Sequence, residues 1–286
     1  MYKASVIISF YNNIEKLKFL LAGLQIQQFN EFEAVIADDG SKPEVVQAIK
    51  EISGNYNFPI QHIWHEDIGW RKNAILNKAI VASKGEVLIF IDGDCIPHPQ
   101  FVKEHYNNRE DLCALAGRRI NMTQNVTDSL TEKKIMKGYL QGLGFVKLIF
   151  QLSFRSINGQ VENGFYIKNQ WIRKKIRKYN RGLIGCNFSL QKKDMLAING
   201  FDERYTSAYI GEDTDIEVRL RNAGGKDKSV KHIALVYHCF HPLRKYENVC
   251  FDVYNSNKEN KVSYTPYGIV MANSPTAPKK ALNNCK

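Results

Sequence analysis

Two aspartates, Asp92 and Asp94, flank a single glycine at the end of an apolar run, Val87–Ile91. The run is short and rich in β-branched and aromatic residues, which predicts a buried strand. Strands of an α/β sheet deliver their last residues to the carboxyl edge, where ligands bind. Two carboxylates there would repel each other unless a cation lay between them, and a divalent metal completed by substrate phosphates is the common solution. The alternative is an ordinary polar turn, because Asp-Gly is also a frequent turn signal.

Polar residues also follow two earlier strand-like segments. Ser9 lies at the end of the first, and Asp38 and Asp39 lie at the end of the second. The chain has neither a GxGxxG turn after its first strand nor a GxxxxGK[ST] loop, which argues against a Rossmann dehydrogenase and a P-loop NTPase. A nucleotide could still bind here if acids held the base and ribose while a metal neutralised the diphosphate.

Strand-like and helix-like segments alternate over the first 110 residues, which predicts a mostly parallel sheet flanked by helices. We expect strands at 4–10, 33–38, 60–65, 87–92, 112–119, 183–190 and 233–238. We expect helices at 14–28, 43–53 (with Ser41 as N-cap), 72–83, 98–107, 171–179, 192–198 and 212–223. Residues 255–286 are polar and rich in Asn, Lys and Pro, so we expect a tail that is poorly ordered or dependent on a partner.

The net charge of +11 over 286 residues is concentrated in one segment. Residues 133–193 hold 14 Lys and Arg and one acid, so they carry +13 and leave −2 for the remainder. No run of 18 apolar residues predicts a transmembrane helix. The first residues lack the pattern of a signal peptide, and the six cysteines are scattered without a CxxC pair. We therefore expect reduced thiols and a cytoplasmic protein.

Several motifs, taken together, resemble glycosyltransferase family 2. In the first half they are SVIISFYN at 5–12, ADDGS at 37–41, GWRKNA at 69–74 and IDGDC at 91–95. In the second half NFSL at 187–190, NGFD at 199–202, GEDTD at 211–215 and VYH at 236–238 are similar to galactosyltransferases and chondroitin-polymerase-like enzymes. The resemblance implies a Rossmann-like α/β fold of the glycosyltransferase A type, with a mostly parallel central sheet. It also implies a UDP-sugar donor and a divalent metal, Mn²⁺ or Mg²⁺.

The same resemblance implies roles for individual residues on the donor side. Asp39 and Arg71 would hold the uracil ring, and Ser9 would lie near the nucleotide. Asp92 would bind the ribose or the metal, and Asp94 would ligate the metal.

Two further pairs would complete the site. Asp213 would be the catalytic base and Glu212 would hold the acceptor sugar, because inverting transfer needs a carboxylate that takes the proton of the attacking hydroxyl. The alternative for this acidic pair is charge compensation at a helix N-terminus. His238 and His241 would be metal ligands, although a strand histidine is often a hydrogen-bonded core residue and His241 could instead contact phosphate.

We therefore expect an inverting, metal-dependent hexosyltransferase. It would move a Gal, GalNAc, Glc or GlcNAc unit from UDP to a glycan or lipid-linked oligosaccharide in bacterial polysaccharide or lipopolysaccharide synthesis. We expect a nucleotide-sugar half at 1–119, a basic insert at 120–182, an acceptor and catalytic half at 183–250 and a tail at 251–286. Within 139–181, an apolar run and a basic amphipathic helix predict attachment to anionic lipid at the inner face of the cell membrane.

Two other function classes are weighed against this one. The +13 segment, with Trp171 and Tyr179 interleaved, fits a nucleic-acid-binding protein. No RRM, KH or helix-turn-helix signature accompanies it and the acidic strand ends would repel a phosphate backbone, so no nucleic acid is expected as a partner. A non-catalytic sugar-nucleotide binder would keep the fold, but the intact acids Asp92, Asp94 and Asp213 argue against it.

Overall fold

The computed structural model describes residues 2–155, 160–176, 182–207, 212–242 and 250–270. The strands in these residues are Ala4–Phe10 (β1), Phe32–Asp38 (β2), Ile60–Trp64 (β3), Val87–Asp92 (β4), Cys95–Pro97 (β5), Cys113–Ala116 (β6), Arg118–Asn121 (β7), Phe188–Gln191 (β8), Lys226–Ser229 (β9) and Leu235–His238 (β10). The helices are Ile14–Gln25 (α1), Pro43–Ser53 (α2), Lys72–Ala82 (α3), Phe101–Asn108 (α4), Gln124–Asp128 (α5), Glu132–Met136 (α6), Leu143–Arg155 (α7), Gln170–Ile176 (α8), Lys192–Ala197 (α9), Asp213–Asn222 (α10) and Phe251–Glu259 (α11), with 3₁₀ turns at Tyr139–Gln141 (η1) and Val161–Gly164 (η2).

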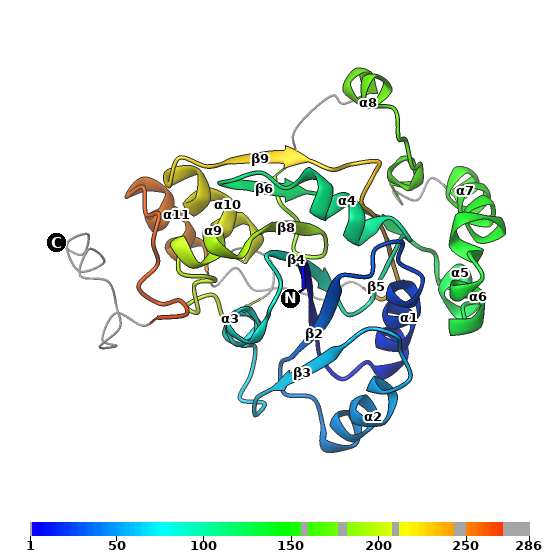
Figure 1. Cartoon of the computed structure of the whole chain (residues 1–286), viewed down its shortest axis with the longest axis horizontal. Coiled ribbons are helices and arrows are strands. Elements are labelled where there is room, and N and C mark those ends of the chain that lie inside the picture. The colour runs from blue at the N-terminus through cyan, green and yellow to red at the C-terminus, as the bar shows by residue number, and fades with distance from the viewer. Residues whose placement is uncertain (1, 156–159, 177–181, 208–211, 243–249, 271–286) are drawn as a thin grey trace.

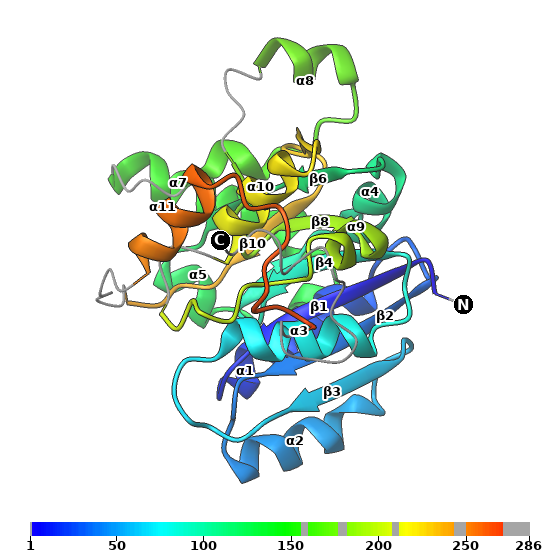
Figure 2. The ribbon, with the colours of Figure 1, turned by 90° about the vertical axis from the view of Figure 1, so that its left-hand side faces the viewer.

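The larger sheet has the strand order β3-β2-β1-β4-β8-β6-β9, and helices lie on both of its sides (Figures 1 and 2). It is parallel except at β8, which runs antiparallel to β4 and β6. The chain builds from β1 outward to β3 and then returns to place β4 on the other side of β1, so the strand order reverses between β1 and β4. Ligands of open α/β sheets bind at the carboxyl ends of strands beside such a reversal. The predicted α/β fold with a mostly parallel central sheet is confirmed.

Burial on both faces explains why the central strands are continuously apolar. In β1, Val6 and Ile8 belong to one core with helix α1, whereas Ile7 belongs to a second core with helix α3. A smaller sheet, ordered β5-β10-β7, is covered by α5, α6 and α7 over a third core. Helix α8 buries none of its residues and projects from the rest of the molecule (Figures 1 and 2). None of the helices in the described residues has the length and apolar character needed to cross a membrane.

One predicted strand, 112–119, is wrong because it is divided between the two sheets. β6 ends at Ala116 and β7 begins at Arg118, with Gly117 between them. Gly117 N donates to the carbonyl of Asn187 at 2.9 Å, and a Cβ at this position would lie 2.0 Å from Asn187 Oδ1. Asn187 therefore packs against Gly117 at the point where the predicted strand would have continued. β8 itself begins only after this contact, at Phe188, and ends at Gln191, so it is shorter than the predicted strand 183–190.

Ser41 is not the N-cap of α2. Lys42 occupies that position without a side-chain cap, and Pro43 begins the helix. Ser41 Oγ instead accepts a hydrogen bond from Asn12 N at 2.7 Å, which ties the loop after β2 to the loop after β1. The predicted N-cap is therefore wrong, because the Ser41 hydroxyl takes part in a tertiary contact and not in a helix cap.

The predicted tail is wrong for residues 255–270, which fold back onto the domain. Asn199 Nδ2 donates to the carbonyls of Thr265 (2.7 Å) and Val270 (2.8 Å), and Thr265 Oγ1 donates to the buried Asp202 at 2.7 Å. Ile269 contacts the core beside α3. Polar side chains of the NGFD segment therefore hold this stretch, while 271–286 lie outside the described residues.

Candidate active site

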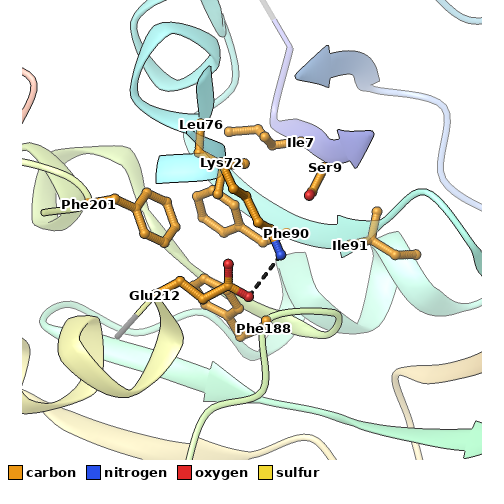
Figure 3. Close-up of a pocket in the computed structure, with 10 residues that line it drawn as sticks. Ile7, Ser9, Lys72, Leu76, Phe90, Ile91, Phe188, Phe201 and Glu212 are labelled. Carbon is orange, nitrogen blue, oxygen red and sulfur yellow. Dashed lines mark hydrogen bonds and ion pairs between the residues drawn. The ribbon is translucent and has the colours of Figure 1, made fainter. Parts of the chain in front are cut away.

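The ends of β1 and β4 bring together two of the predicted site residues. Ser9 and Asp92 are paired in register, and Gly93 N donates to the Ser9 carbonyl at 2.8 Å. This is the point at which the strand order reverses, so the sheet itself places the Asp-Gly-Asp turn at the ligand-binding edge. Ser9 lines a pocket with residues from α3 and from the start of α10 (Figure 3).

Lys72, which the sequence analysis did not select, lies at the centre of this pocket (Figure 3). Its Nζ is 3.0 Å from Asp92 Oδ1 and 2.8 Å from Glu212 Oε1. Burial opposes the charge of the ammonium, but the two carboxylates outweigh it and raise the pKa of Lys72. Burial also opposes the charge of Asp92, yet Lys72 holds the pKa of that carboxyl below its ordinary value. The lysine thus joins Asp92, at the end of β4, to Glu212, at the start of α10.

Glu212 reaches Lys72 because a glycine faces it. A Cβ at Gly185 would lie 2.3 Å from Glu212 Oε1, so any larger residue would displace the carboxylate. Burial and the nearby charge of Asp92 raise the pKa of Glu212, although Lys72 acts in the opposite direction.

Asp213, the predicted base, is the first residue of α10, and its environment raises its pKa to about 7. Burial is the main cause, and the neighbouring Glu212 carboxylate adds to it. The backbone N–H of Thr214, 2.7 Å from Asp213 Oδ1, and that of Gly185 partly compensate. A carboxylate with a pKa near neutrality is suited to exchanging a proton with a sugar hydroxyl.

The second aspartate of the turn lies beside both predicted histidines. Asp94 Oδ2 is 3.5 Å from His238 Nε2 and 3.6 Å from His241 Nε2. His241 Nδ1 lies 2.8 Å from the Pro242 carbonyl, which can only accept, so Nδ1 carries a proton and the ring orientation is fixed. Burial lowers the pKa of His238 to about 4, so this imidazole is neutral at physiological pH.

These side chains fit a divalent cation. Both imidazole Nε2 atoms lie within 3.6 Å of Asp94 Oδ2, and carboxylate oxygen with imidazole nitrogen is a donor set used by Mn²⁺ and related metals. Asn121 Oδ1, from the strand residue paired with His238, is a buried polar atom with no hydrogen-bond partner within the described part of the chain. Asp92 lies outside this cluster because Lys72 holds it, so its expected role with ribose or metal remains a prediction.

The structure also brings Asp39 and Arg71 together. Asp39 Oδ2 accepts from the backbone N–H of Arg71 at 3.1 Å, and Oδ1 is 2.7 Å from His65 Nε2. Lys78 Nζ, which can only donate, lies 3.4 Å from His65 Nδ1, so Nε2 carries the proton toward Asp39. Burial raises the pKa of Asp39, and the His65 contact opposes this. Asp38, in contrast, is fully buried against His62 and serves the turn after β2.

Comparisons with known proteins identify the family of this chain. A family model described as glycosyl transferase family 2 matches residues 5–182. The chain belongs to glycosyltransferase family 2. A second model, described as the N-terminal domain of galactosyltransferase, matches residues 172–242. Sugar transfer is the reaction that the description of this family names.

Two curated relatives match most of this chain. Chondroitin synthase of Escherichia coli is 26% identical over 241 residues, which cover 82% of this chain and 34% of the relative. An uncharacterized glycosyltransferase of Bacillus subtilis (strain 168), YfnE, is 27% identical over 246 residues, which cover 78% of this chain and 61% of the relative. The chain thus spans about a third and about three-fifths of the length of these two proteins.

A solved structure, GalNAc-T7 with UDP, GalNAc and Mn²⁺, has a similar fold. The TM-score is 0.54 at 13% identity, with 84% of this chain and 44% of that chain covered. The expected glycosyltransferase A-type fold is confirmed.

Sequence reasoning did not select Lys72, Gly185 or Asn121, which contact or lie beside the predicted site residues. One signal for Lys72 was available, because a lysine at the first position of a helix opposes the helix dipole and so implies a carboxylate partner. No signal marked Gly185 or Asn121, because both matter only through neighbours that are distant in sequence.

Proposed function

We propose that this protein is an inverting, metal-dependent glycosyltransferase that moves a Gal, GalNAc, Glc or GlcNAc unit from UDP to a glycan acceptor. The pathway would be bacterial polysaccharide or lipopolysaccharide synthesis. One constellation carries the proposal. Asp213, with a pKa of about 7, directly follows Glu212, and Lys72 joins Glu212 to Asp92. Two residues after Asp92 is Asp94, which together with the nearby His238 and His241 we call the Asp94 cluster. A base and a cation site in one connected set are what displacement at an anomeric carbon requires.

On the donor side, the loops after β1, β2 and β4 would bind the nucleotide. Asp39 and Arg71 would hold the uracil, Ser9 would lie beside the nucleotide, and Asp92 would contact the ribose. Asp94, His238 and His241 would hold Mn²⁺ or Mg²⁺, which would supply charge neutralisation for the diphosphate leaving group.

On the acceptor side, Glu212 would orient the sugar and Asp213 would take the proton of its attacking hydroxyl. The new bond from the acceptor oxygen to the anomeric carbon would form as the bond to UDP breaks, and the proton would end on Asp213. A single displacement of this kind inverts the anomeric configuration. Lys72 would keep the carboxylates of Asp92 and Glu212 from repelling each other.

In functional terms we assign residues 1–119 to the donor and 183–250 to the acceptor and catalysis. The similarity to a protein named chondroitin synthase supports a glycan as acceptor. The second function class, a non-catalytic sugar-nucleotide binder, would share the fold but would not use Asp213.

A donor panel tests the proposal. The protein is incubated with Mn²⁺ and with UDP- and GDP-sugars, and nucleotide release is followed by chromatography. We expect slow hydrolysis of one UDP-sugar in the wild type and none in Asp94→Ala. Absence of turnover with every donor, while UDP still binds, would favour the binder over the enzyme. A transfer product that keeps the donor's anomeric configuration by NMR would contradict inversion.

We further propose that segment 139–181 attaches the enzyme to anionic lipid at the inner face of the cell membrane, where a lipid-linked oligosaccharide would be met. Helix α7 exposes Leu143, Val146 and Phe150 at helical spacing, with exposed fractions of 80%, 49% and 60%. Helix α8 exposes Trp171 and Ile172, and Lys175 Nζ lies 3.8 Å from the centre of the Trp171 ring. Apolar side chains flanked by lysines suit helices that lie in the plane of a membrane surface. Arg177, Lys178 and Tyr179, which belong to the same prediction, lie outside the described residues.

A further inference from the structure

Asp39, the acid expected to hold the uracil ring, is fixed at both of its carboxylate oxygens. Oδ1 is 2.7 Å from Nε2 of His65, the residue after β3, and Oδ2 accepts from the backbone N–H of Arg71 at 3.1 Å. The backbone N–H of Asp39 donates to the Phe10 carbonyl at 3.0 Å. The carboxylate therefore has one orientation, and a ligand reaches it only over the 13% of the side chain that is exposed.

The imidazole of His65 is the donor in its contact with Asp39. The ammonium of Lys78, from α3, lies 3.4 Å from His65 Nδ1 and can only donate, so Nδ1 keeps its lone pair and the proton lies on Nε2. His65 is buried, so its ring is held in place and solvent does not compete freely for this hydrogen bond. Lys78, His65 and Asp39 thus form a chain in which the direction of each hydrogen bond is determined.

The protonation state of Asp39 decides which base is complementary to it. An ionised carboxylate only accepts hydrogen bonds, so it fits N3 of uracil, which carries a hydrogen, and not N3 of cytosine, which carries a lone pair. A protonated carboxyl would donate to cytosine instead. Burial raises the pKa of Asp39 and favours the protonated form, whereas the His65 contact and the backbone N–H of Arg71 oppose this. His65 therefore orients the acid and also favours the form that matches uracil.

We propose that His65 is a positioning residue that, through Asp39, makes the donor site selective for uracil over cytosine nucleotides. The nearby His62 provides a comparison, because its Nε2 is 2.9 Å from Oδ2 of Asp38. Asp38 is fully buried and its Oδ1 accepts from Ser41 N at 2.9 Å, so that pair supports the turn and offers no oxygen to a ligand. The inference rests on the proposed contact of Asp39 with uracil, but neither on the metal nor on sugar transfer.

The ratio of the dissociation constants of CDP and UDP tests this role. Both nucleotides carry the same diphosphate, so the contribution of a bound metal cancels in the ratio. Calorimetry of the full chain should show that the wild type binds UDP at least ~10²-fold more tightly than CDP, because a site built to accept a hydrogen bond rejects the base that lacks the donor.

Two replacements of His65 should separate its donor from its bulk. In His65→Leu the UDP affinity should fall ~10–10²-fold, as for the loss of a hydrogen bond to a charged group, while the CDP affinity stays within about threefold. His65→Gln, whose amide can donate from a similar position, should recover most of the ratio. His62→Gln is the matched control and should keep the wild-type ratio. Circular dichroism verifies that each variant is folded, and His65→Phe replaces the Leu variant if that protein is unfolded.

The outcomes separate this inference from the proposed function. A ratio that falls in His65→Leu and recovers in His65→Gln supports the role of His65 even in a protein that transfers no sugar. Equal losses of UDP and CDP affinity, which a merely structural role would give, or the same fall in His62→Gln, would overturn it. A ratio that is lost in Asp39→Asn but kept in His65→Leu would retain the uracil contact and reject the role of His65. A wild type that binds UDP and CDP equally would contradict both.

Discussion

Asp213 illustrates how its surroundings can prepare one carboxylate for chemistry. The residue begins a helix, where the dipole would favour ionisation, yet burial and the adjacent Glu212 raise its pKa to about 7. The helix start does contribute, because the backbone N–H of Thr214 lowers the pKa, but burial and Glu212 outweigh it. The proposed base role depends on the raised pKa.

The replacement Asp213→Asn should act on the chemical step. The amide keeps the shape but cannot take a proton, so we expect kcat to fall by ~10²–10⁴ while the Kd for UDP stays within about twofold. Steady-state kinetics and calorimetry measure the two quantities. Asp111→Asn, an exposed acid paired with Lys193, serves as the control and should leave both unchanged. Near wild-type turnover in Asp213→Asn would reject the base assignment.

The same pKa predicts the pH dependence of turnover. Because the pKa is raised rather than lowered, the base is lost as pH falls through about 7 and not only below 4. We expect kcat to drop about tenfold per pH unit below that point and to level off above it. A profile of kcat at saturating donor and acceptor, from pH 5 to pH 9, measures this. A flat profile down to pH 5 would show that Asp213 does not titrate in the rate-limiting step.

Predictability at the residue scale depended on where a residue's partners lie. Asp92 and Asp94 could be chosen because their strand and turn are local features. The place of Lys72 at the start of a helix favours a carboxylate partner, but the pattern cannot identify that partner as Glu212, 140 residues further on. Cys95 seemed one of six scattered cysteines until the register of β5 and β10 placed it opposite His238.

At the scale of elements, the strands of the larger sheet that are buried on both faces were predictable. The point where the chain passes from the larger sheet to the smaller one was not. β1 and β4 have the predicted bounds because continuous apolar runs specify them. The break at Gly117 depends on the insertion of Asn187, and such a tertiary contact leaves no trace in local periodicity.

Helix α8 and its neighbours carry the membrane prediction. Substituting Gln for Arg173, Lys174 and Lys175 removes three charges, each worth ~1 kcal/mol near an anionic surface, so liposome affinity should fall roughly 10²-fold. Sedimentation with anionic and neutral vesicles at low and high salt measures this. Gln at the exposed lysines Lys42, Lys50 and Lys84 is the matched control. Equal recovery with both lipids, or no loss in the α8 variant, would reject the attachment.

The segment after α11 should contribute to stability through Thr265. Its hydroxyl donates to Asp202 and accepts from Tyr267 N, so Thr265→Val should lower the free energy of unfolding by ~1–3 kcal/mol. Thr265→Ser keeps the hydroxyl and should lose less. Chemical denaturation compares the three proteins, and equal stability of the Val variant would show that this segment is only loosely attached.

At the scale of the whole molecule, the site is assembled from segments that are far apart in sequence. The loops after β1, β2 and β4 supply the expected donor contacts, the start of α10 supplies the acids, and the histidines come from the end of β10 and the segment just after it. The reversal of the strand order between β1 and β4 determines where these segments meet. That reversal is typical of a sheet built from alternating strands and helices, so the fold class was predictable from the alternation. The pairing of Lys72 with Glu212 was not predictable in this way.

The central claim is that a nucleotide and a divalent cation bind together at the Asp94 cluster. Isothermal titration calorimetry of UDP with the wild type, in Mn²⁺ and then in EDTA, tests it most directly, with Asp94→Ala as the matched variant. The account predicts that UDP binding in Mn²⁺ is at least ~10-fold tighter than in EDTA, and that Asp94→Ala in Mn²⁺ binds as weakly as the chelated wild type. Unchanged UDP affinity after chelation would contradict it.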